Sequence, residues 1–187
     1  MMSSKKINKS SIKIIAGKHK GKILYMDILP NTRPTKSIVK ESLFNTLQDS
    51  IKDKILIEVF AGYGSIGFEA FSRGAKKVIF IEKDSSSFSI LLNNINLFNS
   101  PNLVAYNEDS LIFLEQFCKN NKFDILYLDP PFCLDYEVIF TLLSKLDLSN
   151  KIVIMEHISS FVMPKRLNNL SLYKSRKFGR STLSYYF

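Results

Sequence analysis

Cysteine and histidine are scarce in this chain of 187 residues, which holds two of each. Cys118 and Cys133 form no CxxC motif, so the sequence predicts a reducing compartment and no disulfide framework. His19 and His157 lie far apart and have no cysteine nearby, so we expect no metal site. No apolar run approaches the roughly 20 residues that a membrane-spanning helix needs. These absences favour a cytoplasmic protein.

Apolar residues make up 45% of the chain, which is typical of a folded domain and not of a disordered one. At this length we expect a single hydrophobic core. We expect a disordered terminus at residues 1–10, a basic extension made of a β-hairpin and a helix at 11–50, and the main domain at 51–187.

Positive charge is concentrated near the start of the chain, whose formal net charge is +9. Residues 1–40 hold nine lysines and Arg33 against the single acid Asp27, so residues 41–187 sum to zero. A basic segment attached to a neutral body is the pattern of a phosphate-binding arm. The charge therefore predicts contact with nucleic acid; a solvated surface is the alternative.

The basic extension has the pattern of a hairpin followed by a helix. Residues 11–15 and 22–26 are strand-like and flank a basic loop that contains glycine. A helix is expected from about Thr35, which can serve as its N-cap, with Val39 and Leu43 on its apolar stripe.

From residue 55 the chain alternates strand-like and helix-like segments. This alternation is typical of an α/β fold in which helices cover both faces of a parallel sheet. A glycine turn and no helix separate the last two strands, so we expect an antiparallel hairpin there. The predicted strands are residues 55–60, 77–82, 102–106, 123–128, 151–156, 171–175 and 182–187, and the predicted helices are 65–73, 86–98, 109–119 and 135–146.

Three glycines follow the first strand of this alternating region. Gly62, Gly64 and Gly67 fit G-x-G-x-x-G at the opening of a helix, where a tight turn and free N–H groups bind a nucleotide-like ligand. The next strand ends in Glu82, twenty residues beyond Gly62. An acid in that place accepts hydrogen bonds from ribose hydroxyls. The pattern predicts a nucleoside-derived cofactor; a solvated strand end is the alternative for Glu82.

A second motif, Asp129-Pro130-Pro131-Phe132, directly follows the strand at 123–128. Ligands of open α/β sheets bind at the carboxyl ends of the strands. Asp129 and the Pro130 carbonyl can each accept a hydrogen bond from an exocyclic amine. Phe132 can stack on a base, and such stacking contributes roughly 1–3 kcal/mol of binding free energy per base. The motif predicts a binding site for a planar base; a strand that ends in a proline turn is the simpler alternative.

The order and spacing of these motifs resemble one family. With the hairpin, Arg33-Pro34-Thr35 and Glu41-Ser42-Leu43-Phe44-Asn45, they are similar to the bacterial enzymes that methylate N2 of a guanine in 16S ribosomal RNA. The resemblance runs from about Ile12 to Phe187. It implies the class I methyltransferase fold, a Rossmann-like parallel sheet with an antiparallel C-terminal hairpin. Lys36-Ser37-Ile38 departs from the family, which usually has an Asp and an Arg in that helical turn.

The resemblance also implies roles for single residues. Asp129, Pro130 and Phe132 would be catalytic, and Glu82 would bind the cofactor's ribose. Asp109 would accept a hydrogen bond from its adenine amine, although Asp109 could equally cap a helix. The residues that bind S-adenosyl-L-methionine would be Phe60, Gly62, Gly64, Gly67, Glu82 and Asp109. The charge of the N-terminal segment predicts that the substrate is bound by Lys13, Lys18, Lys20 and Lys22, to which we add Arg33 and Thr35.

The implied reaction is methyl transfer from S-adenosyl-L-methionine to the N2 amine of a guanine in small-subunit (16S) ribosomal RNA. The partner would be this RNA or an assembling small ribosomal subunit. Asp129 and the Pro130 carbonyl would orient the amine and stabilise the charge that grows on nitrogen. The base must be flipped or already unpaired. We expect a monomer that binds no membrane.

Four other functions fit part of the sequence. A DNA methyltransferase that acts on adenine N6 or cytosine N4 uses the same Asp-Pro-Pro-aromatic motif, but the chain has no insertion large enough for a DNA target-recognition domain. A methyltransferase of protein glutamine amides favours Asn at position 129. A nicotinamide-dependent dehydrogenase would use Glu82 but gives residues 129–132 no role. Identification of the bound cofactor would distinguish this function from the others. A non-catalytic RNA-binding module needs neither motif.

Overall fold

The computed structural model describes residues 9–27 and 37–187. Its centre is an eight-stranded sheet with the strand order β5-β4-β3-β6-β7-β10-β9-β8. The first five strands in this order are parallel, and β10, β9 and β8 are each antiparallel to the strand before them. The bounds are β3 Ile55–Val59, β4 Lys77–Ile81, β5 Leu103–Tyr106, β6 Ile125–Leu128, β7 Ile152–Ile158, β8 Arg166–Leu167, β9 Leu170–Phe178 and β10 Ser181–Tyr186.

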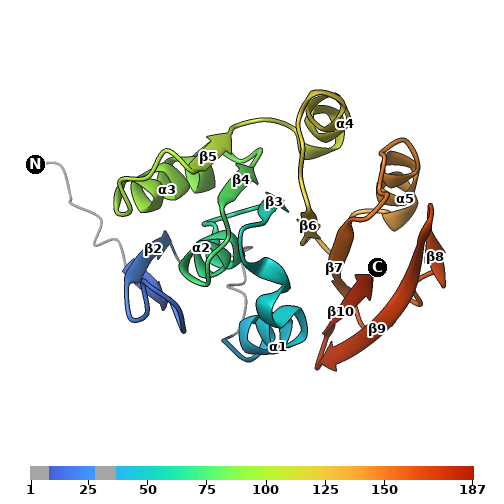
Figure 1. Cartoon of the computed structure of the whole chain (residues 1–187), viewed down its shortest axis with the longest axis horizontal. Helices are drawn as coiled ribbons and strands as arrows, with labels where there is room; N and C mark the ends of the chain where they lie inside the picture. Colours follow the sequence, from blue (N-terminus) through green and yellow to red (C-terminus); the bar gives the residue numbers. More distant parts are fainter. Residues whose placement is uncertain (1–8, 28–36) are drawn as a thin grey trace, which may run out of the picture.

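Helices cover both faces of this sheet, with α1, α2 and α3 on one face and α4 and α5 on the other (Figure 1). The bounds are α1 Ser37–Leu47, α2 Ser65–Ser72, α3 Ser85–Asn96, α4 Ser110–Asn120 and α5 Tyr136–Ser144, and a 3-10 helix, η1, spans Gln48–Ile51. Across the described ranges, none of the helices is long and apolar enough to cross a bilayer.

The hydrophobic core is divided in two by the sheet. Because successive side chains of a strand point to opposite faces, Leu56 of β3 belongs to the same core cluster as Phe68 of α2, and Ile57 belongs to the cluster of Leu114 of α4. All four side chains are fully buried. The central strands are thus covered on both sides, which explains why they are continuous apolar runs in the sequence.

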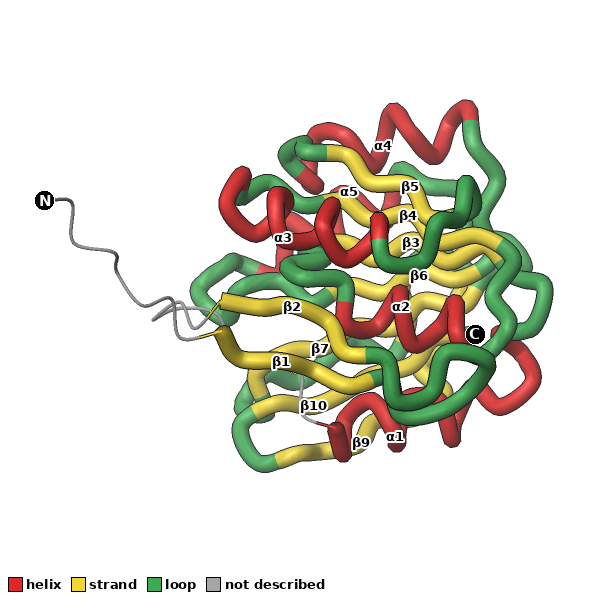
Figure 2. The backbone as a smooth tube through the Cα atoms, turned by 90° about the vertical axis from the view of Figure 1, so that its left-hand side faces the viewer, coloured by secondary structure: helices red, strands yellow, loops and turns green. Residues whose placement is uncertain are grey.

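The N-terminal hairpin is a separate two-stranded antiparallel sheet of β1 (Lys9–Lys13) and β2 (Ile23–Asp27). It lies beside α2 and α3 (Figure 2). Glu69 of α2 is fully buried, and its carboxylate accepts hydrogen bonds from the backbone N–H groups of Ile15 at 2.8 Å and Ala16 at 3.0 Å. The hairpin is therefore held on the helix that follows the glycine loop.

A buried lysine completes this attachment. Lys40 of α1 is fully buried; its Nζ donates to the Lys13 carbonyl at 3.0 Å and lies 3.9 Å from Glu69 Oε2. Burial lowers the pKa of Lys40, while the charge of Glu69 opposes this change. Gly17 approaches the Ser72 carbonyl so closely that a Cβ at this position would overlap it. The basic extension is thus packed against the main domain through specific polar contacts.

The predicted α/β fold with an antiparallel C-terminal hairpin is confirmed. Predicted strand and helix ends from residue 55 onward agree within two residues, except that β9 continues to Phe178. The short strand β8 and the helix η1 were not predicted. Arg33, Thr35 and residues 1–8 lie outside the described part of the chain, so the expected N-cap and the expected disorder of residues 1–8 remain predictions. For Lys9 and Ser10 the expectation of disorder is wrong, because both residues pair with β2 as part of β1.

Candidate active site

A cavity of about 1390 Å³ opens where the parallel strands end. Its wall follows the carboxyl ends of β3, β4, β5 and β6 in turn, the position at which open α/β sheets bind ligands. The sequence-predicted residues on its wall are Phe60, Gly62, Glu82, Asp109, Asp129, Pro130 and Phe132.

The glycine loop is tied to the acid that ends β4. Glu82 Oε2 accepts a hydrogen bond from the N–H of Gly62 at 2.6 Å, and its Oε1 accepts one from the N–H of Asp84 at 2.7 Å. Phe60 and Gly62 both have positive φ, 59° and 54°. A Cβ added to Gly62 would meet nothing within 4 Å. The loop therefore presents bare backbone beside a carboxylate, as a cradle for a nucleoside requires.

The second and third glycines of the motif are not on the cavity wall. A Cβ at Gly64 would lie 2.6 Å from the Phe68 ring and 2.7 Å from Leu91, and a Cβ at Gly67 would overlap Phe80. These glycines allow α2 to pack closely on the sheet and on α3. A valine at Gly64 would therefore disrupt the packing of α2. The cofactor-binding roles that the resemblance implies for Gly64 and Gly67 stay predictions, and neither residue lines the cavity.

Glu58 of β3 is a cavity residue that the sequence analysis missed. It is 3% exposed, and its carboxylate accepts hydrogen bonds from the N–H groups of Ile66 at 3.2 Å and Gly67 at 2.7 Å, in the first turn of α2. Burial raises its pKa to about 8, although both backbone hydrogen bonds oppose the rise. Glu58 thus links β3 to the start of the helix that follows the glycine loop.

Asp109 has the second of its two predicted roles. It is the N-cap of α4, and its carboxylate accepts from the N–H of Leu111 at 3.0 Å. Lys83 donates to the same carboxylate at 2.6 Å, and this hydrogen bond lowers the pKa of Asp109. Since Asp109 also lines the cavity, the proposed adenine contact would have to share this carboxylate with Lys83.

Asp129 directly follows β6 and faces the cavity beside Glu58 and Glu156. Burial, followed by the charges of Glu156 and Glu58, raises the pKa of Asp129 well above that of an ordinary aspartate. Pro130 is buried, whereas Phe132 is 38% exposed at the wall. The motif thus combines a basic carboxylate with a ring that is free to receive a stacked base.

Glu156 of β7 is the second cavity acid that the sequence analysis missed. It is buried, and Tyr127 donates its hydroxyl to Glu156 Oε2 at 3.1 Å. Burial and the Glu156 charge raise the pKa of Tyr127, so the phenol remains a donor. Although acids gather here, no group of three or more His, Cys, Asp or Glu side chains in the described ranges is placed to hold a metal ion.

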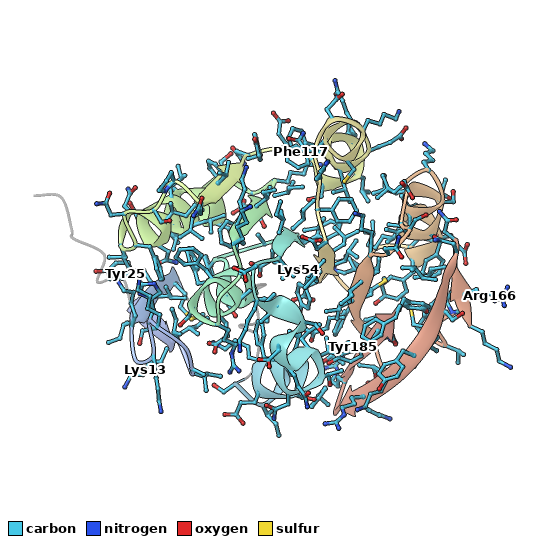
Figure 3. All side chains as sticks on the ribbon, in the orientation of Figure 1. Lys13, Tyr25, Lys54, Phe117, Arg166 and Tyr185 are labelled. Atoms are coloured by element: carbon cyan, nitrogen blue, oxygen red, sulfur yellow. The ribbon has the colours of Figure 1, made fainter. Side chains whose placement is uncertain are left out.

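The predicted substrate-binding lysines of the N-terminal hairpin differ in their contacts. Lys13, Lys18 and Lys20 are exposed, and Lys13 extends outward from the hairpin (Figure 3). Lys22 instead donates to the Leu97 carbonyl at 2.6 Å, with its Nζ 4.7 Å from the centre of a phenylalanine ring. Lys22 therefore also fixes the hairpin to the end of α3.

The C-terminal strands carry a second basic region that the charge count concealed. Residues 161–187 hold six lysines and arginines and no acid, and this excess cancels an equal negative excess in residues 41–160. Arg180, in the turn between β9 and β10, is exposed and lines the cavity. Positive charge thus lies at the mouth of the cavity itself.

Comparisons with known proteins agree with this geometry. The family model described as "Conserved hypothetical protein 95" matches residues 12–187. Ribosomal RNA small subunit methyltransferase D of Haemophilus influenzae is 41% identical over 126 residues, which are 66% of this chain and 65% of that protein. The protein of the same name from Escherichia coli strain K12 is 37% identical over 121 residues, 65% of this chain and 60% of that protein. The matched part is thus under two-thirds of either relative.

Solved structures share the fold. The Escherichia coli protein yhhF has a TM-score of 0.80 at 30% identity, over 95% of this chain and 97% of that chain. A ribosomal protein L11 methylase from Lactobacillus delbrueckii subsp. bulgaricus has a TM-score of 0.61 at 17% identity, over 80% and 77% of the two chains, which shows the fold alone. The predicted class I methyltransferase fold and the family resemblance are confirmed, and the chain belongs to the family described as Conserved hypothetical protein 95.

Proposed function

We propose that this protein transfers a methyl group from S-adenosyl-L-methionine to the N2 amine of a guanine in small-subunit ribosomal RNA. The observation that carries the proposal is one cavity that holds both motifs, the loop of Gly62 with Glu82 and the carboxylate of Asp129 with Phe132. The names of the two relatives, ribosomal RNA small subunit methyltransferase D, support an RNA substrate.

The residues of the cavity fit the proposed cofactor. Gly62 leaves open space at the loop, and Glu82 lies beside it as an acceptor for ribose hydroxyls. The carboxylates of Glu58 and Asp129 favour a positively charged ligand. When bound, S-adenosyl-L-methionine supplies an electrophilic methyl group on a sulfonium.

The chain's own residues would position the amine. Asp129 and the Pro130 carbonyl accept hydrogen bonds from the two amine hydrogens, so the nitrogen lone pair points toward the methyl group. As the nitrogen–carbon bond replaces the bond between the methyl carbon and sulfur, positive charge would grow on nitrogen, and the Asp129 carboxylate would stabilise it. The raised pKa of Asp129 makes this carboxylate a better acceptor for the departing proton than an ordinary aspartate. Phe132 stacks on the flipped base.

Replacing Glu82 by Ala is expected to weaken binding of S-adenosyl-L-methionine roughly 10- to 100-fold, because charged hydrogen bonds of about 1.5–3 kcal/mol are lost at the ribose and loop. Titration calorimetry measures the change. The matched control is Glu108→Ala, an exposed acid near the end of β5 that is not on the cavity wall. Unchanged affinity in Glu82→Ala would refute the ribose role, and binding of NADH in place of S-adenosyl-L-methionine would identify a dehydrogenase.

Neutralising Lys13, Lys18 and Lys20 by Gln is expected to weaken RNA binding without changing cofactor affinity. Each lost phosphate contact should flatten the slope of log K against log salt by roughly 0.7–0.9. Lys22 is left in place because it also anchors the hairpin. RNA binding at several salt concentrations provides the measurement.

The matched control for this triple variant replaces the exposed lysines Lys119, Lys122 and Lys145, which lie in or just after α4 and α5. These helices are at the opposite end of the molecule from the hairpin (Figure 1). If both triple variants lower the salt slope equally, the hairpin is only a solvated surface.

A further inference from the structure

Asp129, directly after β6, lies beside Glu156 of the neighbouring parallel strand β7. Leu128 of β6 pairs with Met155 of β7, so the two acids occupy the next position on each strand. Neighbouring strands are about 4.8 Å apart. Tyr127, two residues before Asp129, and Ile154, two residues before Glu156, belong to the same core cluster. Because side chains alternate, both acids point to that same face.

Both carboxylates face the cavity and accept few hydrogen bonds from other groups of the protein. Both line its wall, and the Glu156 charge raises the pKa of its neighbour. In the described part of the chain we find one hydrogen bond to the Glu156 carboxylate, the one from Tyr127 to Oε2. Glu156 is buried and Asp129 is half-buried. A ligand that brings two adjacent donors would pair both acceptors, and this favours its binding because a buried acceptor left unpaired is costly.

Guanine is the RNA base that meets this requirement. Its Watson–Crick edge carries two neighbouring donors, the N1–H and the N2 amine. Adenine offers the N6 amine beside the lone pair of N1, and cytosine offers the N4 amine beside the lone pair of N3. With either of these bases, a lone pair would face a carboxylate. Sites that leave buried polar groups unpaired reject the wrong substrate strongly.

We propose that Glu156 accepts a hydrogen bond from guanine N1–H while Asp129 accepts from the N2 amine, so that Glu156 selects guanine over adenine and cytosine. The inference rests on the proposed function, since it assigns the base read by the same cavity. It adds a specificity-determining residue from β7, which belongs to neither sequence motif. Tyr127 holds this carboxylate in place through its hydroxyl.

The test uses 2-aminopurine, a base with the same N2 amine but with a lone pair at N1 in place of the N–H. We measure binding of a single-stranded RNA with one guanine, or with 2-aminopurine in its place, to the full chain with S-adenosylhomocysteine. The wild-type protein should prefer guanine. Glu156→Gln, whose amide can donate to the N1 lone pair, should reduce this preference at least tenfold, as expected for one charged hydrogen bond.

A ratio of two affinities within one variant is unaffected by partial loss of folded protein. Glu108→Gln is the matched control, an exposed acid that does not line the cavity; it should keep the wild-type preference. The inference is wrong if wild-type protein shows no guanine preference, or if Glu156→Gln retains it. Methyl transfer is assayed separately. A guanine preference without methyl transfer would refute the proposed function and leave the role of Glu156 standing.

Discussion

Replacing Asp129 by Ala is expected to lower the rate of methyl transfer by about 10²–10³, because one contact made to the developing charge in the transition state is lost. Cofactor affinity should fall by no more than a few-fold: the Asp129 charge that favours the sulfonium is lost, but Glu82 and the glycine loop are unchanged. Single-turnover transfer of a labelled methyl group to RNA measures the rate.

Asp135→Ala is the matched control for this variant. Asp135 is exposed and caps α5 by accepting from the N–H of Glu137. Its removal should cost about 1 kcal/mol of stability and leave methyl transfer unaffected. If the Asp129 variant kept most of its activity, the four-residue motif would be only a proline turn.

The dependence of the methyl-transfer rate on pH gives a second test of the role of Asp129. Asp129 must be ionised to accept from the amine, and its raised pKa means that it is still protonated at pH values where an ordinary aspartate is ionised. The rate should therefore rise with pH up to values well above 3.8, the ordinary aspartate pKa. Asp129→Asn, which cannot titrate, should lose this rise. Glu156 and Glu58 both raise this pKa, and a bound sulfonium would lower it.

Replacing Glu69 by Ala is expected to lower the free energy of unfolding by about 3–5 kcal/mol, because it breaks a buried ion pair and leaves one charge uncompensated. The carboxylate accepts from two backbone N–H groups of the hairpin and from Arg73 Nε at 2.8 Å. Its removal leaves Lys40, which is fully buried, with the Lys13 carbonyl as a partner. Denaturant unfolding measures the change.

Glu115→Ala is the matched control, since Glu115 also forms an ion pair four residues along its helix, with Lys119 at 2.9 Å, but on an exposed surface. Such a pair is worth about 1 kcal/mol or less. A double variant of Glu69→Ala with Lys40→Met should recover part of the lost stability by removing the orphaned charge. Equal effects of Glu69→Ala and Glu115→Ala would mean that the hairpin is not held by this carboxylate.

The two motifs were predicted from sequence because each is continuous along the chain. Gly62 follows β3 and Asp129 follows β6, and the carboxyl ends of parallel strands meet at one edge. Local pattern therefore predicted both the elements and the edge at which the site lies. It could not distinguish Gly62, which faces open space, from Gly64, where a side chain would overlap Phe68 and Leu91. That difference arises from packing between α2 and α3.

The count of charged residues is limited in the same way, because it does not show which charges are buried or paired. Counting residues predicted the basic N-terminal segment, but Lys40 in it is fully buried and Lys22 is bound to α3. The count also concealed the basic C-terminal strands, because their charge cancels that of the acidic middle of the chain. Whether a charge faces solvent, an ion-pair partner or a cavity depends on neighbours that are distant in sequence.

The sequence by itself determined the order of strands and helices, the glycine loop and the motif Asp129-Pro130-Pro131-Phe132, because these depend on residue types that are adjacent in the chain. The tertiary structure alone decided that Glu58, Asp129 and Glu156 line one cavity. These acids belong to β3, β6 and β7 or follow them directly, strands that are distant in sequence and adjacent in the sheet. A single acid in an apolar run has the same local pattern wherever its strand lies. Only the strand order places the three carboxylates together.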